Sequence, residues 1–165
     1  MNGSFSHEKR NACYETDLFE ENKVLYQKAN VPNQLVELQL EERILEYLSC
    51  MGKDLYFYVS EYGVALTSLF SVETILEEAF DEYNKPCIEN GYLVIGKGPN
   101  GDLLCVDIKK STVGYAYHDD LWEGLFEDFS DIYIEIPILL DDFIEMMLTD
   151  KNHYPFDGYE AEKYL

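Results

Sequence analysis

The chain has 165 residues, of which 47% are hydrophobic and 15% aromatic, and its 33 acidic and 12 basic side chains give a formal net charge of −21. This length and hydrophobic content suffice for one domain with a substantial core, and they exclude a disordered acidic chain. The negative charge repels phosphate groups and anionic lipids, so we expect binding neither to nucleic acid nor to a membrane surface.

The N-terminus lacks the apolar run of a secretion signal, and no stretch is long enough to cross a bilayer, so we expect a soluble cytoplasmic protein. Its cysteines are widely scattered, without a CxxC pair and without a histidine at ligand spacing. Reduced thiols and no zinc site are therefore expected. The four positions are Cys13, Cys50, Cys87 and Cys105.

The N-terminal third predicts helices. Residues 1–13 are polar and unpatterned, which indicates a flexible segment, and residues 18–29 predict a first helix. Pro32 is suited to begin a second helix that extends to residue 51, where Gly52 ends it. Its apolar stripe consists of Leu40, Ile44, Tyr47, Leu48 and Met51.

Residues 54–70 contain two aromatic and β-branched runs around Glu61-Tyr62-Gly63, which predicts a hairpin. The clearest helix of the chain follows over residues 72–83, with Ser71 as its cap and Pro86 closing the segment. Phe70 and Ile75 occupy the positions of a hydrophobic staple. The stripe of this helix consists of Val72, Ile75, Leu76, Ala79, Phe80 and Tyr83.

Residues 91–118 predict a three-stranded antiparallel meander. Asn100-Gly101 predicts a type I′ turn between its first two strands, and both strands are apolar on both faces, so helices or loops must cover them. A last strand is expected over residues 132–136, and the Pro137 that follows is tolerated at a strand edge or at the start of a helix. An amphipathic helix carrying Leu140, Phe143, Ile144 and Met147 follows, and then a polar tail, residues 151–165.

Together these elements predict a single α+β domain over residues 1–165, with a central antiparallel sheet flanked by helices. The sheet comprises the hairpin 54–70, the meander 91–118 and the strand near 132–136.

Candidate catalytic residues are few. His118-Asp119-Asp120 resembles part of a phosphohydrolase metal site, but the other histidines, His7 and His153, lie near the two termini. Residues 96–101 lack the Lys-Ser/Thr of a phosphate-binding loop, and the acidic residues lack the spacing of an EF-hand. We therefore expect no enzyme activity, no cofactor and no metal.

The most informative feature is an acidic segment that contains no lysine or arginine. Its seven acids are Asp119, Asp120, Glu123, Glu127, Asp128, Asp131 and Glu135. Apolar side chains interleave with them, namely Trp122, Leu125, Phe126 and Phe129. One interpretation is an amphipathic loop or short helix whose carboxylates face water. The other is an electronegative contact surface with an aromatic anchor. Under the second, the partner-binding residues are Asp119, Asp120, Trp122, Glu123, Glu127, Asp128 and Asp131.

The order of these signals resembles the SUKH superfamily, which joins fungal Smi/Knr-type cell-wall-synthesis regulators with bacterial immunity proteins that neutralise toxins. The resemblance spans residues 66–150, and the helix after Pro32 matches the family pattern only loosely. It implies an α+β fold, no catalytic residues and a protein-binding role. Gly96, Gly101 and Asp102 match the family's turn between two central strands, and Trp122 matches its aromatic position.

Our leading hypothesis is an immunity protein that binds and neutralises a basic toxin or enzyme domain through its acidic surface. The alternatives are a regulatory scaffold of the Smi/Knr type and a metal-dependent phosphohydrolase that uses His118 and Asp119.

Overall fold

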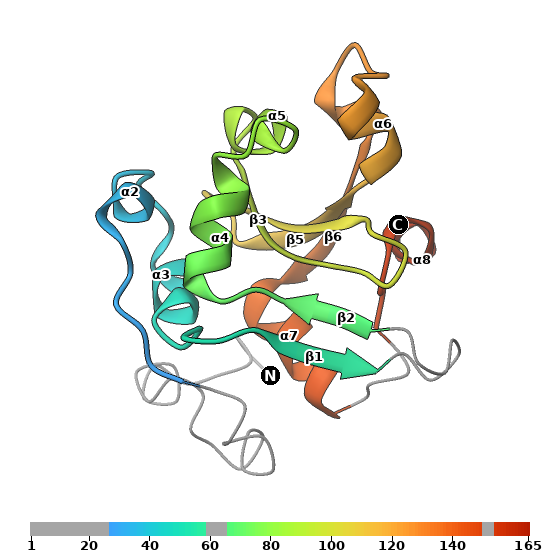
Figure 1. Cartoon of the computed structure of the whole chain (residues 1–165). Helices are drawn as coiled ribbons and strands as arrows, with labels where there is room; N and C mark the ends of the chain where they lie inside the picture. The colour runs from blue at the N-terminus through green and yellow to red at the C-terminus, as the bar shows by residue number, and fades with distance from the viewer. Residues whose placement is uncertain (1–26, 59–65, 150–153) are drawn as a thin grey trace.

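A six-stranded antiparallel sheet organises residues 27–58, 66–149 and 154–165, which are the parts of the chain that the computed structural model describes (Figure 1). Its strands are β1 (Leu55–Tyr58), β2 (Leu66–Leu69), β3 (Tyr92–Lys97), β4 (Leu103–Asp107), β5 (Thr112–Ala116) and β6 (Tyr133–Leu139). The strand order across the sheet is the order along the chain, so each strand pairs antiparallel with the strands before and after it in the sequence. The predicted α+β class is confirmed.

The predicted hairpin and meander both form. In the hairpin, β1 pairs with β2 from Leu55–Leu69 to Tyr58–Leu66, while the predicted turn at 61–63 lies outside the described residues. The meander comprises β3, β4 and β5. Gly96 borders β2 so closely that an added Cβ would lie 2.2 Å from the carbonyl oxygen of Ser68. Only glycine allows this approach of the two strands.

The predicted type I′ turn at Asn100-Gly101 is wrong. Gly101 has a φ of +97°, but Asn100 is not among the described residues with positive φ. The N–H of Gly101 donates to the carbonyl of Gly98 at 3.0 Å, so the turn spans Gly98 to Gly101. Pro99 takes its second position, where a φ fixed near roughly −65° suits an ordinary turn.

The predicted helix from Pro32 to residue 51 is in fact two helices, α2 (Asn33–Val36) and α3 (Glu42–Leu48). They are separated at Gln39, which has a left-handed φ of 58°. Glu41 caps α3 by accepting from the N–H of Arg43, and its own N–H donates to the carbonyl of Ile108 at 3.0 Å. These contacts override the continuous helical pattern, although all five residues of the predicted stripe are buried.

The predicted helix over residues 18–29 lies mostly outside the described residues, as does the predicted flexible segment 1–13. The last residues of this predicted helix, from residue 27 onward, are described and are not helical. Gln27 forms a parallel bridge with Met51, and the N–H of Ala29 donates to the carbonyl of Ser49 at 2.8 Å.

Helix α4 (Val72–Ala79) begins as predicted, with the Ser71 hydroxyl accepting from the N–H of Thr74 at 3.2 Å. It ends earlier than predicted, so Phe80 and Tyr83 are 52% and 59% exposed instead of lying on a buried stripe. Pro86 does not close this segment but lies in the first turn of α5 (Lys85–Glu89), where a missing N–H costs nothing.

Strand β6 forms one edge of the sheet, which explains why the exposed Pro137 is tolerated there. The next helix, α7 (Leu140–Thr149), buries all four residues of its predicted stripe. Between β5 and β6 lie α6 (His118–Glu123) and a 3₁₀ turn, η3 (Phe129–Asp131).

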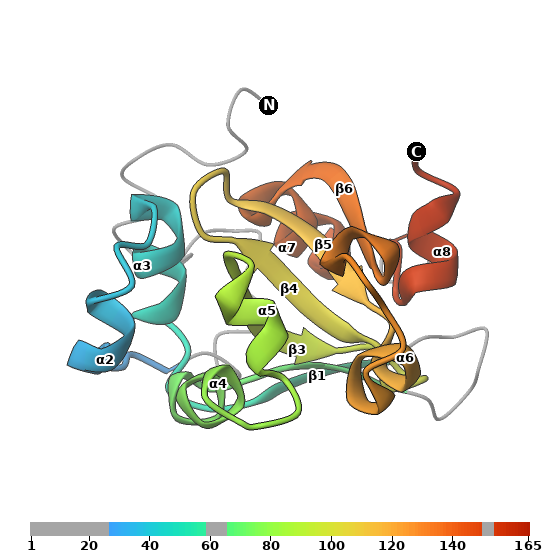
Figure 2. The same cartoon turned by 90° about the horizontal axis from the view of Figure 1, so that it is seen from above.

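Both faces of the central strands are covered, as their apolar sequences predict. On one face Cys87 of α5 lies against Cys105 of β4, and burial raises the pKa of the Cys105 thiol well above its usual value. Neighbouring residues on a strand point to opposite faces, so the pair Leu104 and Tyr115 faces the other side, where α7 lies (Figure 2). There the Tyr115 hydroxyl donates to the carbonyl of Pro155 at 2.8 Å.

The C-terminal residues are part of this second layer. Tyr154 and Phe156 are each 2% exposed, and α8 (Gly158–Glu162) lies against β5 and β6. The predicted polar tail therefore contributes aromatic side chains to the core from residue 154 onward.

Candidate partner-binding surface

Helix α6 carries the beginning of the acidic segment, from Asp119 to Glu123. It has acidic residues Asp119 and Asp120 in its first turn, where they interact favourably with the helix dipole, and it ends at Gly124 in a left-handed conformation. Leu121 is buried at 3% exposure, whereas Trp122 is 45% exposed. The helix thus turns one side into the core and leaves its tryptophan at the surface.

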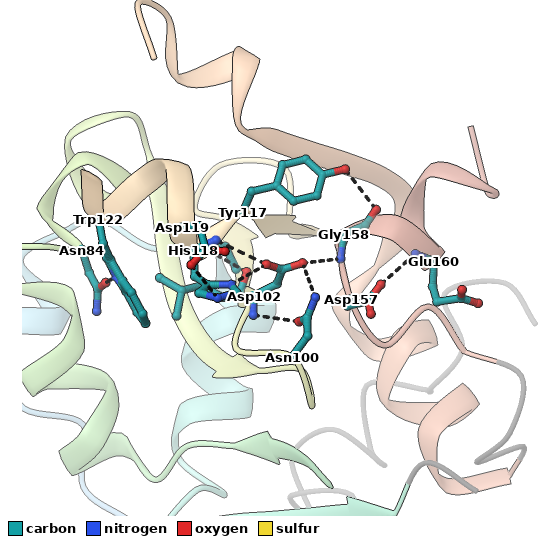
Figure 3. A network of polar contacts seen from close by, with 12 residues as sticks. Asn84, Asn100, Asp102, Tyr117, His118, Asp119, Trp122, Asp157, Gly158 and Glu160 are labelled. Atoms are coloured by element: carbon teal, nitrogen blue, oxygen red, sulfur yellow. Dashed lines mark hydrogen bonds and ion pairs between the residues drawn. The ribbon is translucent and has the colours of Figure 1, made fainter. Parts of the chain in front are cut away.

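Trp122 is held in place by a hydrogen bond to a residue far away in the chain. Its indole Nε1 donates to Oδ1 of Asn84 at 2.8 Å (Figure 3). Nδ2 of Asn84 in turn donates to Oε2 of Glu78. An indole can only donate and a carboxylate can only accept, so the orientation of the amide between them is fixed. Asn84 is 3% exposed, and this buried link joins the turn after α4 to α6.

Beside this link lies a surface pocket of about 350 Å³, lined by Glu78, Asp81, Tyr83, Asn84 and Trp122. It combines two aromatic side chains with two carboxylates. Burial and the nearby charge of Asp81 raise the pKa of Glu78 above its usual value, while Lys97 acts in the opposite direction. The pocket is therefore an electronegative hollow with aromatic walls.

The predicted partner-binding acids divide into two groups. Asp119 and Glu123 are exposed on α6, on either side of Trp122 in the sequence. Glu127, Asp128 and Asp131 are exposed on the segment that includes η3. Asp120 is only partly exposed. Of the seven predicted residues, only Trp122 lines the pocket described above.

Two acids of the second group have structural tasks. Asp128 and Asp131 form a reciprocal capping box around η3. Asp128 also borders a second hollow of about 510 Å³, whose other lining residues are Asn90, Tyr92, Phe129, Ser130, Tyr133 and Glu135. Glu135 lies 3.7 Å from the Lys110 ammonium, so the last acid of the segment is paired with a base from outside it.

The interleaved apolar residues also divide. Phe129 is buried and stacks against Tyr92 and Tyr133, with ring centroids 5.3 and 5.4 Å away. Phe126 packs against the Phe129 ring in a T-shaped arrangement, whereas Leu125 is 62% exposed. The interpretation of an amphipathic segment whose carboxylates face water thus fits η3. In contrast, α6 and the residues just after it present apolar side chains to the surface.

His118, the candidate for hydrolase chemistry, joins α6 to the turn between β3 and β4. Its Nδ1 lies 2.8 Å from Oδ1 of Asp102, and its Nε2 lies 3.1 Å from Oδ1 of Asp119 (Figure 3). Both ring nitrogens face carboxylates. Within residues 27–58, 66–149 and 154–165, no group of three His, Cys, Asp or Glu side chains is arranged to hold a metal ion.

The residues of the predicted family turn hold the fold together. Asp102, 1% exposed, accepts the backbone N–H groups of His118 and Gly158, at 3.3 and 3.0 Å. It also accepts from the side chain of Asn100 at 3.1 Å. Gly101 supplies the positive φ of the turn, so these positions serve a structural junction.

Sequence reasoning missed Asn84 and the acids around it. Glu78 and Asp81 have the pattern of solvated helix residues, and nothing in the local sequence links them to Trp122. The available signal was Asn84 itself, a polar residue directly before Lys85-Pro86, where a helix starts. Its burial depends on the packing of α6, which local patterns do not predict.

Comparisons of the chain with protein-family models, with curated proteins and with solved structures give no match. Among the helices in the described part of the chain, none is both long and apolar enough to cross a membrane.

Proposed function

We propose that the chain is a non-enzymatic protein-binding module that recognises a basic partner through an acidic aromatic surface. We define this surface as Asp119, Trp122 and Glu123 of α6 together with Glu78 and Asp81. The observation that carries the proposal is the half-exposed Trp122, fixed by its hydrogen bond to Asn84 and surrounded by carboxylates. Tryptophan is enriched among the residues that dominate binding energy at protein interfaces.

The charge of the chain supports a basic partner. A net charge of −21 attracts cationic proteins over a long range, and the segment from Asp119 to Glu135 contains no lysine or arginine. Complementary charge of this kind raises association rates and suppresses binding to acidic proteins.

The resemblance to the SUKH superfamily supports a more specific role, that of an immunity protein. Such a protein binds a cognate toxin and covers its functional surface, so it needs neither a cofactor nor a catalytic group. Shape and charge complementarity are sufficient for this task.

The test first identifies the neighbouring genes and then uses the full chain with any toxin or enzyme domain that one of them encodes. Calorimetry at low salt is expected to detect a complex, and the toxin assay is expected to lose activity at one equivalent. Absence of binding at low salt would overturn the proposal. Binding with unchanged toxin activity would remove the immunity role and favour a regulatory scaffold.

A further inference from the structure

The pocket beside Trp122 is preorganised. Oδ2 of Asp81 accepts the backbone N–H groups of Tyr83 and Asn84 at 2.9 and 3.3 Å. Asn84 in turn fixes one oxygen of Glu78 and the indole of Trp122. A ligand that enters this pocket therefore meets side chains that are already ordered, which lowers the entropic cost of binding.

Both carboxylates keep an unused acceptor. In the described part of the chain, no hydrogen bond reaches Oε1 of Glu78 or Oδ1 of Asp81. Lys97 is exposed, and among the described residues it forms no ion pair with Glu78. Its charge acts on this carboxyl group only from a longer distance. The pKa of Glu78 is raised because burial and the charge of Asp81 outweigh the opposing effect of Lys97.

We propose that this pocket binds the guanidinium group of an arginine side chain on the partner protein, an inference that rests on the proposed function. A guanidinium is planar, so it can stack on an aromatic ring while its N–H groups point at the unused oxygens of Glu78 and Asp81. Lysine offers a compact, strongly hydrated ammonium without this geometry. The volume of about 350 Å³ is at the small end of the range for ligand pockets, which suits one side chain.

Trp122 makes the proposal directly measurable, because it is the only tryptophan in the chain. The probes are three acetylated tripeptide amides, Gly-Arg-Gly, Gly-Lys-Gly and Gly-citrulline-Gly. Citrulline has nearly the shape of arginine but no charge. The arginine peptide is expected to change the fluorescence of Trp122 and to shift its indole N–H resonance saturably, with Kd on the order of 1 mM. The citrulline peptide is expected to bind at least about 10-fold more weakly, and the lysine peptide to lie between them.

Three variants locate the site. Glu78→Gln and Asp81→Asn should each weaken binding of the arginine peptide by about 10-fold, since each removes one charged acceptor. Glu73→Gln removes one exposed charge from the same helix outside the pocket and should leave Kd within about twofold. Equal binding of the arginine and citrulline peptides, or unchanged binding by Glu78→Gln, would overturn the inference.

The outcomes also separate this inference from the proposed function. If the toxin domain binds but the arginine peptide does not, the pocket assignment fails and the binding role stands. If the peptide binds at the pocket and the toxin domain does not, the pocket takes a cation and the proposed partner is wrong.

Discussion

Oδ2 of Asp102 accepts the backbone N–H of Gly158 at 3.0 Å, which joins the turn between β3 and β4 to the start of the last helix, 56 positions later in the sequence. The other oxygen of the same carboxylate faces the N–H and the ring of His118. One buried acid therefore fastens three separate segments.

Asp102→Ala is expected to lower the free energy of unfolding by about 3 kcal/mol, because it leaves several buried donors without an acceptor. Urea denaturation followed by circular dichroism measures the change. Asp119→Ala is the matched control, since Asp119 contacts the same histidine but its side chain is 83% exposed, and it should cost less than about 0.5 kcal/mol. Equal effects of the two variants would show that Asp102 does not act as the junction.

Phe156→Ala is expected to cost about 3 to 5 kcal/mol, because this ring is 2% exposed and its loss leaves a cavity beneath the sheet. Thermal and urea unfolding should both register the loss. Leu165→Ala, at a position 75% exposed, is the control and should stay within about 0.5 kcal/mol of the parent. A small effect of Phe156→Ala would mean that residues after 153 are dispensable for the core.

The sheet could be predicted because its signals are local. The apolar runs of β3, β4 and β5 and the helical spacing in α4 and α7 depend only on neighbouring residues. Each element forms where the pattern indicates, although α4 ends before the last residues of its predicted stripe. The break between α2 and α3 could not be predicted. It depends on Glu41 contacting Ile108 and Ser111, two residues that are distant in the sequence.

The candidate site could likewise be predicted only where its signals are local. The composition of the acidic segment singled out Trp122, which the structure places at the surface, but the pocket around it comes from the turn after α4. Asn84 and Trp122 are 38 positions apart, and only the folded chain brings their polar atoms together. The C-terminal aromatics were missed because Tyr154 and Phe156 follow no helical or strand period.

Stability should rise as the pH is lowered from 7 toward the ordinary carboxylate range. Burial raises the pKa of Glu78, Asp142 and Asp157 above their usual values of 4.5, 3.8 and 3.8. A group with a raised pKa in the folded state binds its proton more tightly there. Its stabilising effect is complete below the unfolded pKa and is lost as the pH rises through the folded pKa. Lowering the pH also reduces repulsion within a chain of net charge −21.

Urea midpoints measured between pH 7 and pH 4.5 test this direction. Glu78→Gln should make the slope shallower, because it removes one of the groups whose pKa is raised in the folded state. If stability instead falls steadily as the pH is lowered from 7 to 4.5, the charged forms of these three carboxyl groups do not destabilise the folded state.

Charge reversal at Asp119 and Glu123 is expected to slow association with a basic partner by about 10-fold or more at low salt. These acids are exposed, whereas Asp128 and Asp131 cap η3, so reversing the latter would confuse binding with folding. Stopped-flow fluorescence of Trp122 at low salt and at 1 M salt measures the rate. The loss should largely vanish at 1 M, where the screening length is about 3 Å.

The control for this experiment is reversal at Glu37 and Glu42, two exposed acids at the α2 and α3 end of the molecule, away from α6 (Figure 2). They alter the net charge in the same direction, so they report the effect of total charge alone. If both sets of reversals slow association equally, the partner responds to overall charge and the interface is not on α6. The low-salt condition is set at 0.1 M, where a Debye length of about 10 Å confines each charge to its own neighbourhood. A selective loss at α6 would then mean that the local field around Trp122 steers the partner.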